Sequence, residues 1–308
     1  MSTLPLIIDT DPGVDDFLAI LLAYAAGLPI AGITTVFGNA GIEQTTRNAL
    51  TIVEMLGMDA PVFQGAEKPL YKEKRLAESH GANGLGGFEL PFLSRSLSKE
   101  SSLEGMERIA DDQERLWMIG LGPCTNITQA LRIFSLRQKL EKLILMAGVF
   151  GEVGNVTSYA EFNAYNDPDA LQAILQAGVM PVLIPADVCR RVTVSASDIN
   201  GMAKGKIGGN IQRIADAYIR YYSTNAVYGG FEGGVMYDVL TVIYLLRPDL
   251  FRAHAVCVEV NCTDSERRGE TTIKDGERPN CQLVIDVNAT AAKTFFLTTI
   301  GQWSSPHS

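Results

Sequence analysis

The sequence predicts an α/β protein: a single domain with a mainly parallel, twisted sheet flanked by helices. Strand-like apolar runs alternate with helical stretches through the first two-thirds of the chain. Such alternation is typical of right-handed crossovers between parallel strands. Several runs end in Gly, Asn, Asp or Pro, which places polar loops at one edge of the sheet. Because no proline- or serine-rich linker divides the chain, we expect one domain over residues 1–303.

The elements are expected in a regular order. The first strand covers residues 4–8, and a helix follows over 15–26, with Pro12 suited to a first helical position because it lacks an N–H. The other strand-like runs of the first two-thirds are 30–36, 61–63, 116–120, 142–146 and 182–185, with helical runs at 42–56, 126–134 and 168–177. Later come helices near 195–203, 209–227 and 238–246, strands near 256–260 and 283–287, and a closing helix over 289–300.

Two segments stand outside this alternation. Residues 66–115 contain a polar, glycine-bearing stretch that is long for a plain loop, so we expect a mobile lid over a site. Residues 304–308 are expected to form a frayed tail.

Composition favours a soluble enzyme with a large core. The 308 residues are 46% hydrophobic and 20% charged, with a net charge of −9. The chain has no Lys/Arg run, so we expect no nucleic-acid groove. Its five cysteines are odd in number and form no CxxC pair, which predicts reduced thiols and a cytoplasmic protein. The N-terminal apolar run is too short for a membrane span and lacks secretion-signal features, so we expect no membrane partner.

An acidic cluster follows the first strand. Asp9, Asp11, Asp15 and Asp16 fall within eight residues, directly after the apolar run. Unpaired carboxylates beside a low-dielectric core are costly, and they are usually tolerated where a cation or a donor binds. Helix capping and the helix dipole account for one or two such acids, but hardly for four. The cluster therefore predicts a ligand site where open α/β sheets bind ligands, at the carboxyl ends of strands.

The cluster allows two other interpretations. A calcium EF-hand loop does not fit, because position six from Asp9 is Val14 instead of Gly and position twelve is Ile20 instead of Glu. An Asp-x-Asp after a strand also resembles the nucleophile loop of haloacid-dehalogenase-type phosphatases. A Mg²⁺-dependent phosphatase is therefore an alternative, although its later lysine and paired acids are not evident at strand ends.

Two further segments carry polar side chains that suit a ligand site. The stretch 154–163 contains Asn155, Glu161 and Asn163, whose amides and carboxylate suit the vicinal hydroxyls of a sugar. A polar connection before the helix at 168 explains them equally well. Asp238 begins an apolar helical run, where capping is the ordinary role of an aspartate.

Together these segments resemble the inosine–uridine preferring nucleoside hydrolase family. The run from Asp9 to Asp16 (DTDPGVDD) matches the family's N-terminal signature nearly letter for letter. The likeness continues through 38–39, 80–86, 121–126, 155–163, 187–192 and 268–271, and so covers essentially the whole chain. It implies an active site at the carboxyl ends of the strands, and a homodimer or homotetramer.

The resemblance also implies a cofactor and a reaction. One Ca²⁺ would be held by hard oxygen ligands, and ribose by a second set of side chains. The implied reaction is hydrolysis of the N-glycosidic bond of ribonucleosides, giving ribose and a free purine or pyrimidine base, with Asp11 as general base for a calcium-bound water. The implied calcium ligands are Asp11, Asp16, the Thr125 carbonyl and Asp238, and the implied ribose ligands are Asp15, Asn39, Asn155, Glu161 and Asn163.

One position departs from the family pattern. Many members carry a histidine directly before the last metal-binding aspartate, where it can protonate the departing base, but here that residue is Tyr237. A phenol, with a pKa of about 10, donates a hydrogen bond more readily than a proton. His80 matches a family position facing the base, so His80 and Tyr237 are both candidate leaving-group residues, and Tyr222, Tyr228 and Phe231 are candidates for the same pocket. The departure leaves open a non-catalytic ribose-binding protein, and it leaves the base preference open.

Overall fold

The computed structural model describes residues 3–77, 79–81, 83–89, 93–202, 205–224 and 231–304. Its centre is a nine-stranded sheet within this described part, with a small two-stranded sheet beside it. The large sheet contains β1 (Leu6–Thr10), β2 (Ile30–Thr35), β3 (Val62–Gln64), β4 (Leu116–Gly120), β5 (Leu140–Met146), β6 (Val182–Ile184), β9 (Phe251–Val260), β10 (Thr271–Lys274) and β11 (Cys281–Val287). The small sheet pairs β7 (Thr193–Val194) with β8 (Gly234–Val235).

The large sheet is mainly parallel, as predicted. Its strand order is β10-β9-β11-β6-β5-β4-β1-β2-β3. Every neighbouring pair from β11 to β3 is parallel. Strands β9 and β10 join one edge in antiparallel orientation. The predicted α/β fold is therefore confirmed.

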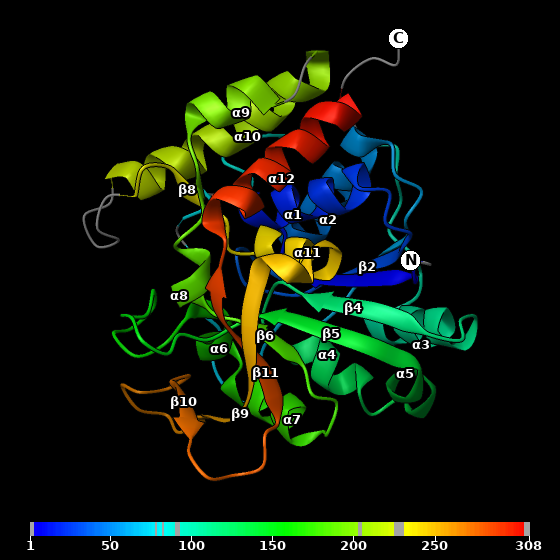
Figure 1. The fold of residues 1–308 in the computed structure, drawn as a ribbon. Coiled ribbons are helices and arrows are strands. Elements are labelled where there is room, and N and C mark those ends of the chain that lie inside the picture. Colours follow the sequence, from blue (N-terminus) through cyan, green and yellow to red (C-terminus); the bar gives the residue numbers. More distant parts are fainter. Residues whose placement is uncertain are drawn as a thin grey trace.

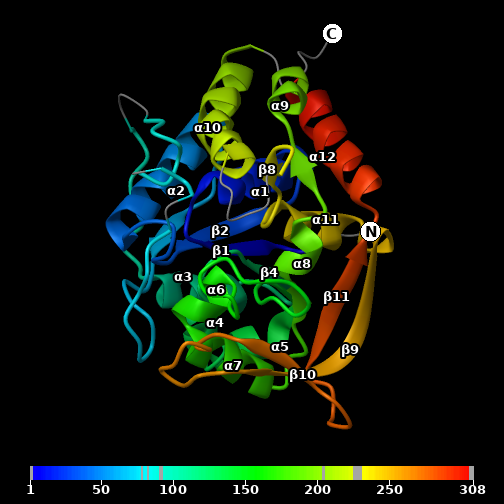
Figure 2. The ribbon, with the colours of Figure 1, turned by 90° about the vertical axis from the view of Figure 1, so that its left-hand side faces the viewer.

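Helices cover both faces of the sheet (Figures 1 and 2). On one face lie α1, α2, α11 and α12, with α9 and α10 stacked beyond α1 and α12; on the other lie α3, α4, α5 and α7. The helices are α1 (Val14–Ala25), α2 (Ile42–Leu56), α3 (Ser102–Asp111), α4 (Thr125–Ala130), α5 (Phe134–Lys139), α6 (Phe162–Asn166), α7 (Pro168–Gln176), α8 (Ala186–Cys189), α9 (Ala196–Met202), α10 (Gly205–Thr224), α11 (Val239–Leu246) and α12 (Ala289–Ser304).

Strand β1 shows why the apolar runs form the sheet. Leu6, Ile7 and Ile8 have no solvent exposure. Leu6 and Ile8 belong to one hydrophobic core, and Ile7 belongs to the core on the opposite face. Successive side chains of a strand point to opposite faces, so a strand covered on both sides needs a continuous apolar run.

Helix α1 begins later than Pro12. Its first residue is Val14, and Gly13 is the N-cap. Asp16 supplies the capping interaction instead, because its carboxylate accepts the Gly13 N–H at 2.9 Å. The helix thus starts one residue before the expected position 15, and the acidic loop ends in its first turn.

Other elements also differ from expectation. The helix expected over 126–134 is two short helices, α4 and α5, because Ile133 between them has extended backbone. Strand β9 begins at Phe251, five residues before the expected start, and β10 was not predicted. The short helix α6 was not predicted either. Residues 225–227 of the helix expected over 209–227 lie outside the described residues.

The segment 66–115 has two parts. Residues 102–111 form α3, whose Met106 and Ile109 are buried in a hydrophobic core. The described residues between 66 and 100 contain neither helix nor strand. Only residues 66–100 are therefore still candidates for a lid, and a lid there is a proposal. At the chain end, Ser304 closes α12, and 305–308 lie outside the described residues.

None of the helices in the described part is both long enough and apolar enough to cross a membrane.

Candidate active site

A pocket opens at the carboxyl edge of the sheet. It is lined by residues from the loops after β1, β2, β4 and β5, from the 75–80 segment and from α10. Most of the predicted site residues meet here, although they come from distant parts of the chain. Those that line it are Asp11, Asp15, Asn39, His80, Asn155, Glu161, Asn163, Tyr237 and Asp238. Asp16 and Thr125 are buried and do not line the pocket.

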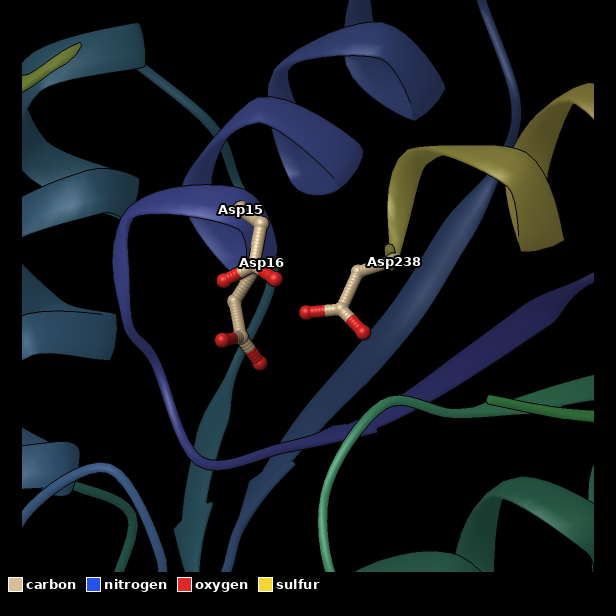
Figure 3. Close-up of side chains that lie close together, drawn as sticks. All are labelled: Asp15, Asp16 and Asp238. Carbon is tan, nitrogen blue, oxygen red and sulfur yellow. The ribbon is translucent and has the colours of Figure 1, made fainter. Parts of the chain in front are cut away.

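Three buried carboxylates converge beside this pocket. One oxygen each of Asp15, Asp16 and Asp238 lies within 4.8 Å of the others. Figure 3 shows the Asp238 side chain, at the start of α11, pointing toward the two aspartates in the first turn of α1. The Asp238 carboxylate makes no capping hydrogen bond. Its place in the cluster therefore does not follow from helix capping.

The electrostatics of these acids favour a bound cation. Burial raises the pKa of Asp238, and the charges of Asp15 and Asp16 raise it further. Burial and the charge of Asp16 likewise raise the pKa of Asp11. Asp15 has a pKa raised by burial to about 7, and its Oδ1 has no hydrogen-bond partner among the described residues. Mutually repelling, buried oxygen donors of this kind fit a divalent cation that prefers oxygen ligands.

Local hydrogen bonds fix the orientation of the acidic loop. The Asn39 backbone N–H donates to Asp11 Oδ2 at 2.7 Å, and the Asn39 side chain donates to Asp16 Oδ2 at 3.0 Å. The Thr10 hydroxyl donates to the other oxygen of Asp16. Asn39 therefore joins the loop after β2 to the acidic loop, in addition to lining the pocket.

Asp9 lies behind the pocket and supports it. Its Oδ1 accepts hydrogen bonds from the Thr34 hydroxyl at 2.6 Å and the Asn126 amide at 2.8 Å. Burial raises the pKa of Asp9 to about 7 despite these bonds. A buried Asp9 that does not line the pocket does not fit the nucleophile of the phosphatase alternative.

Thr125 is placed at the start of α4. Its hydroxyl donates to Asp167 Oδ2 at 2.6 Å, and Asp167 also accepts the Leu70 N–H at 3.0 Å. These bonds tie the loop after β4 to the segment that leads toward His80.

Glu161 and Asn163 are held by backbone groups. The Glu161 carboxylate caps α6 by accepting the Asn163 and Ala164 N–H groups, and it also accepts the Gly148 N–H at 2.9 Å. Burial outweighs these bonds and raises the pKa of Glu161 to about 7. The Asn163 amide nitrogen donates to the carbonyls of Leu121 and Met146, so its oxygen is the atom left for a ligand.

His80 is a neutral hydrogen-bond donor. The Val14 N–H donates to His80 Nδ1 at 3.1 Å, which assigns the ring proton to Nε2. Burial lowers the pKa of His80 to about 4. The imidazole also stacks on Tyr218, with ring centroids 5.2 Å apart. At neutral pH the ring offers an N–H and carries no charge.

Aromatic side chains also gather at the pocket. Tyr222 and Tyr237 line it, with ring centroids 6.1 Å apart. Phe231 packs against Tyr222 at 6.2 Å, behind the lining residues. Tyr228 lies outside the described residues.

Sequence reasoning missed several residues at this site, among them Tyr218, Tyr221 and Arg190. Tyr218 donates to Asp15 Oδ2 at 3.3 Å, and Tyr221 lines the pocket. Both share a face of α10 with Tyr222 at i, i+3, i+4 spacing, which sequence alone reads as core packing. Arg190 lies beside Tyr237, where its charge opposes the rise in pKa that burial causes in the phenol. It stands within the 187–192 motif, but the motif gave no sign of this contact.

The chain is similar to known proteins over most of its length. Residues 6–294 match the family model described as inosine-uridine preferring nucleoside hydrolase. Uridine nucleosidase 1 of Arabidopsis thaliana is 36% identical over 80% of this chain and 75% of that protein. The pyrimidine-specific ribonucleoside hydrolase RihA of Salmonella agona is 32% identical over 92% and 94%. A solved purine-preferring ribonucleoside hydrolase from Gardnerella vaginalis superposes with a TM-score of 0.90 at 28% identity, over 97% and 99%. The chain therefore belongs to the inosine-uridine preferring nucleoside hydrolase family, and it is a nucleoside hydrolase.

Proposed function

We propose that this enzyme hydrolyses the N-glycosidic bond of ribonucleosides in a Ca²⁺-dependent reaction, releasing ribose and a free purine or pyrimidine base. The observation that carries the proposal is the convergence of the buried carboxylates of Asp15, Asp16 and Asp238 beside one pocket, which Asp11 also lines. The same pocket is lined by amides and carboxylates, as a sugar requires, and by aromatic rings, as a planar base requires.

The metal would be held at the acidic loop. Its ligands would be Asp11, Asp16, Asp238 and the Thr125 carbonyl, all hard oxygen donors. A bound Ca²⁺ supplies orientation of a water and of the ribose hydroxyls, and it lowers the pKa of that water. Asp11 would accept the proton of the attacking water.

Ribose would be gripped by Asp15, Asn39, Asn155, Glu161 and Asn163. The glycosidic bond breaks through a state in which positive charge builds on the sugar ring, and carboxylates and amide oxygens stabilise that charge. Buried polar groups that bind the ribose hydroxyls would be left unpaired by deoxyribose. We therefore expect discrimination against deoxynucleosides by several powers of ten.

The departing base would be met by His80 and Tyr237. His80 would donate a hydrogen bond through Nε2, because its Nδ1 already accepts the Val14 N–H. Tyr237 would donate through its phenol, whose oxygen has no partner of good hydrogen-bond geometry among the described residues. The base preference is part of what the test below measures, since the relatives include a pyrimidine-specific and a purine-preferring hydrolase.

The proposal includes a cytoplasmic enzyme that assembles as a homodimer or homotetramer, with a lid within residues 66–100. Five free cysteines are consistent with a reducing compartment. Light scattering of the purified protein tests the assembly.

Nucleoside turnover with and without a chelator tests the function. We expect release of reducing sugar from at least one of inosine, adenosine, uridine and cytidine, loss of release on chelation, and recovery on addition of Ca²⁺. The Asp11→Ala variant should lose at least about 100-fold in kcat/KM. Asp249→Ala, at an exposed acid paired with Arg247, is the matched control and should keep full activity. Binding of ribonucleosides without turnover, or an Asp11→Ala variant that keeps both calcium binding and hydrolysis, would contradict the proposal.

A further inference from the structure

Arg190 is a largely buried cation beside Tyr237, which lines the pocket. Its side chain is 11% exposed. Its Nη1 donates to the Val153 carbonyl at 2.7 Å and to Glu152 Oε2 at 3.0 Å. Both partners belong to the loop that carries Asn155 into the pocket. Arg190 is therefore anchored to the loop that carries Asn155, one of the proposed ribose ligands.

The same short segment of chain also holds Tyr237. The Met236 N–H donates to the Val192 carbonyl at 3.0 Å, and the Cys189 thiol lies 3.5 Å from the Tyr237 carbonyl. The backbone before and at Tyr237 is thus fixed by residues on either side of Arg190. The backbone bonds do not fix the direction of the phenol O–H, which depends on the groups around the ring.

Two buried polar atoms without a hydrogen-bond partner of good geometry lie where Arg190 and Tyr237 adjoin. Arg190 Nε and the Tyr237 hydroxyl are both buried, and neither has a partner of good hydrogen-bond geometry in the part of the chain that the structure describes. The two side chains nevertheless lie within hydrogen-bonding reach of each other, and Tyr222 is a second polar neighbour of the Tyr237 hydroxyl. Unpaired buried polar atoms are costly, so a small adjustment that joins them is favourable.

The polarity of such a contact is fixed by chemistry. A guanidinium has five N–H donors and no acceptor, and it does not lose its proton. Toward the Tyr237 oxygen it can only donate. The phenol proton must then point away from Arg190, and Tyr237 lines the pocket.

We propose that Arg190 is a positioning residue, which orients the Tyr237 hydroxyl so that it donates a hydrogen bond to the departing base. This inference rests on the proposed function. In the reaction, the bond from C1′ to the base nitrogen breaks and its electron pair stays on the base. Water adds to C1′, and the proton that it gives up balances the one that the base finally takes. Arg190 forms no bond to substrate, and its effect is confined to the leaving group.

Leaving-group dependence tests the inference. We compare kcat/KM for the best nucleoside of the panel with that for a nitrophenyl riboside, whose nitrophenolate departs without help from an acid. Arg190→Met should lower nucleoside hydrolysis about 10- to 100-fold and change nitrophenyl riboside hydrolysis less than about threefold. Arg190→Lys keeps a donor of the same charge and should retain part of the nucleoside activity.

Two further variants separate positioning from folding. Arg191→Met is the matched control, because its guanidinium pairs with Asp286 on the surface; it should leave both substrates unchanged. Tyr237→Phe should reproduce the selective loss, and adding Arg190→Met to it should cost little more, because both changes remove one interaction.

The outcomes distinguish the inference from the proposed function. If the wild-type enzyme hydrolyses no nucleoside, the proposed function fails and the inference fails with it. If it does, and Arg190→Met slows both substrates equally or adds fully to Tyr237→Phe, only the inference is overturned. If the Arg190→Met variant does not fold, two other variants test the inference: Tyr237→Phe, and Tyr237→Phe combined with Arg190→Lys. A loss of equal size on both substrates in these variants again contradicts the inference.

Discussion

At the scale of single residues, the proposed general base sits in a narrow slot. A Cβ at Gly122 would lie 2.5 Å from Asp11 Oδ1, and one at Gly38 would lie 2.0 Å from Asp11 Oδ2. The Asn39 N–H holds Asp11 Oδ2 from the same side as Gly38. The slot therefore admits the Asp11 carboxylate only because two neighbouring residues lack a side chain.

Gly122→Ala is expected to displace the Asp11 carboxylate. The added methyl also lies 2.8 Å from Val36 Cγ1, so it has no easy way to move aside. We expect Ca²⁺ affinity, measured by titration calorimetry, to fall about 10- to 100-fold, in keeping with an overpacking cost of about 1–3 kcal/mol. Gly209→Ala is the control, because nothing lies within 4 Å of its added Cβ. Equal calcium affinity in the two variants would show that the slot does not constrain Asp11.

At the scale of elements, the antiparallel edge of the sheet braces the pocket. Arg268 lies between β9 and β10 and is 6% exposed. Its Nε donates to the Tyr165 carbonyl on α6, and its Nη2 donates to the Glu73 carbonyl, both at 2.9 Å. One side chain thus joins the C-terminal hairpin to the helix after Glu161 and to the segment that leads to His80.

Arg268→Ala is expected to destabilise the fold. Two carbonyls would lose a charged donor in a largely buried place, which costs about 2–3 kcal/mol. Urea unfolding should show this loss of free energy, together with a raised KM for nucleosides because the 69–77 segment is released. Arg252→Ala, on β9, removes an exposed ion pair with Asp286 of β11 and should cost less than about 1 kcal/mol. A loss of similar size in both variants would contradict a bracing role for Arg268.

The elements also show what the sequence can and cannot predict. The central parallel strands were predictable because burial on both faces demands apolar runs such as that of β1. Strand β10 (TTIK) lies at the edge, is largely exposed, and carries no such run. Helix α3 did leave a signal, the Ser101–Glu104 capping box, which the lid interpretation overlooked.

The residues of the site likewise differ in whether the sequence predicts them. The acidic loop is contiguous, so its density of charge was visible in the sequence. Tyr218 and Arg190 reach the pocket from separate elements, so no local pattern reports their contacts with Asp15 and Tyr237. Contacts between distant segments follow from the packing of the whole chain.

At the scale of the whole molecule, the fold carries a cluster of acids between two hydrophobic cores. The central strands separate the two cores. The acidic loop directly follows β1, a strand whose residues are fully buried. Burial raises the pKa of Asp9 and Asp15 to about 7, and it raises the pKa of Asp11, Asp16 and Asp238 in the same direction. The stability of the metal-free protein is therefore coupled to pH.

The sign of this coupling gives the last prediction. A carboxyl whose pKa is raised from 3.8 to about 7 on folding stabilises the fold fully below pH 3.8, and this contribution is lost as the pH rises through about 7. With chelator present, Tm from scanning calorimetry should fall by at least about 4 °C between pH 6.5 and pH 8.0. Saturating Ca²⁺ should raise Tm at both pH values and most at pH 8.0, because it binds the ionised carboxylates of the folded state.

The buried acids dominate the change in stability over this pH window. Burial lowers the pKa of His80 to about 4, which gives the opposite slope, but that slope fades above about pH 6.5 as the histidine of the unfolded chain also loses its proton. Exposed acids with lowered pKa, such as Glu100, are ionised in both states above pH 6. Asp238→Asn removes one member of the cluster, so its metal-free Tm should depend less on pH than that of the wild type. A metal-free Tm that stays constant or rises from pH 6.5 to 8.0 would show that the buried acids do not set the stability of the fold.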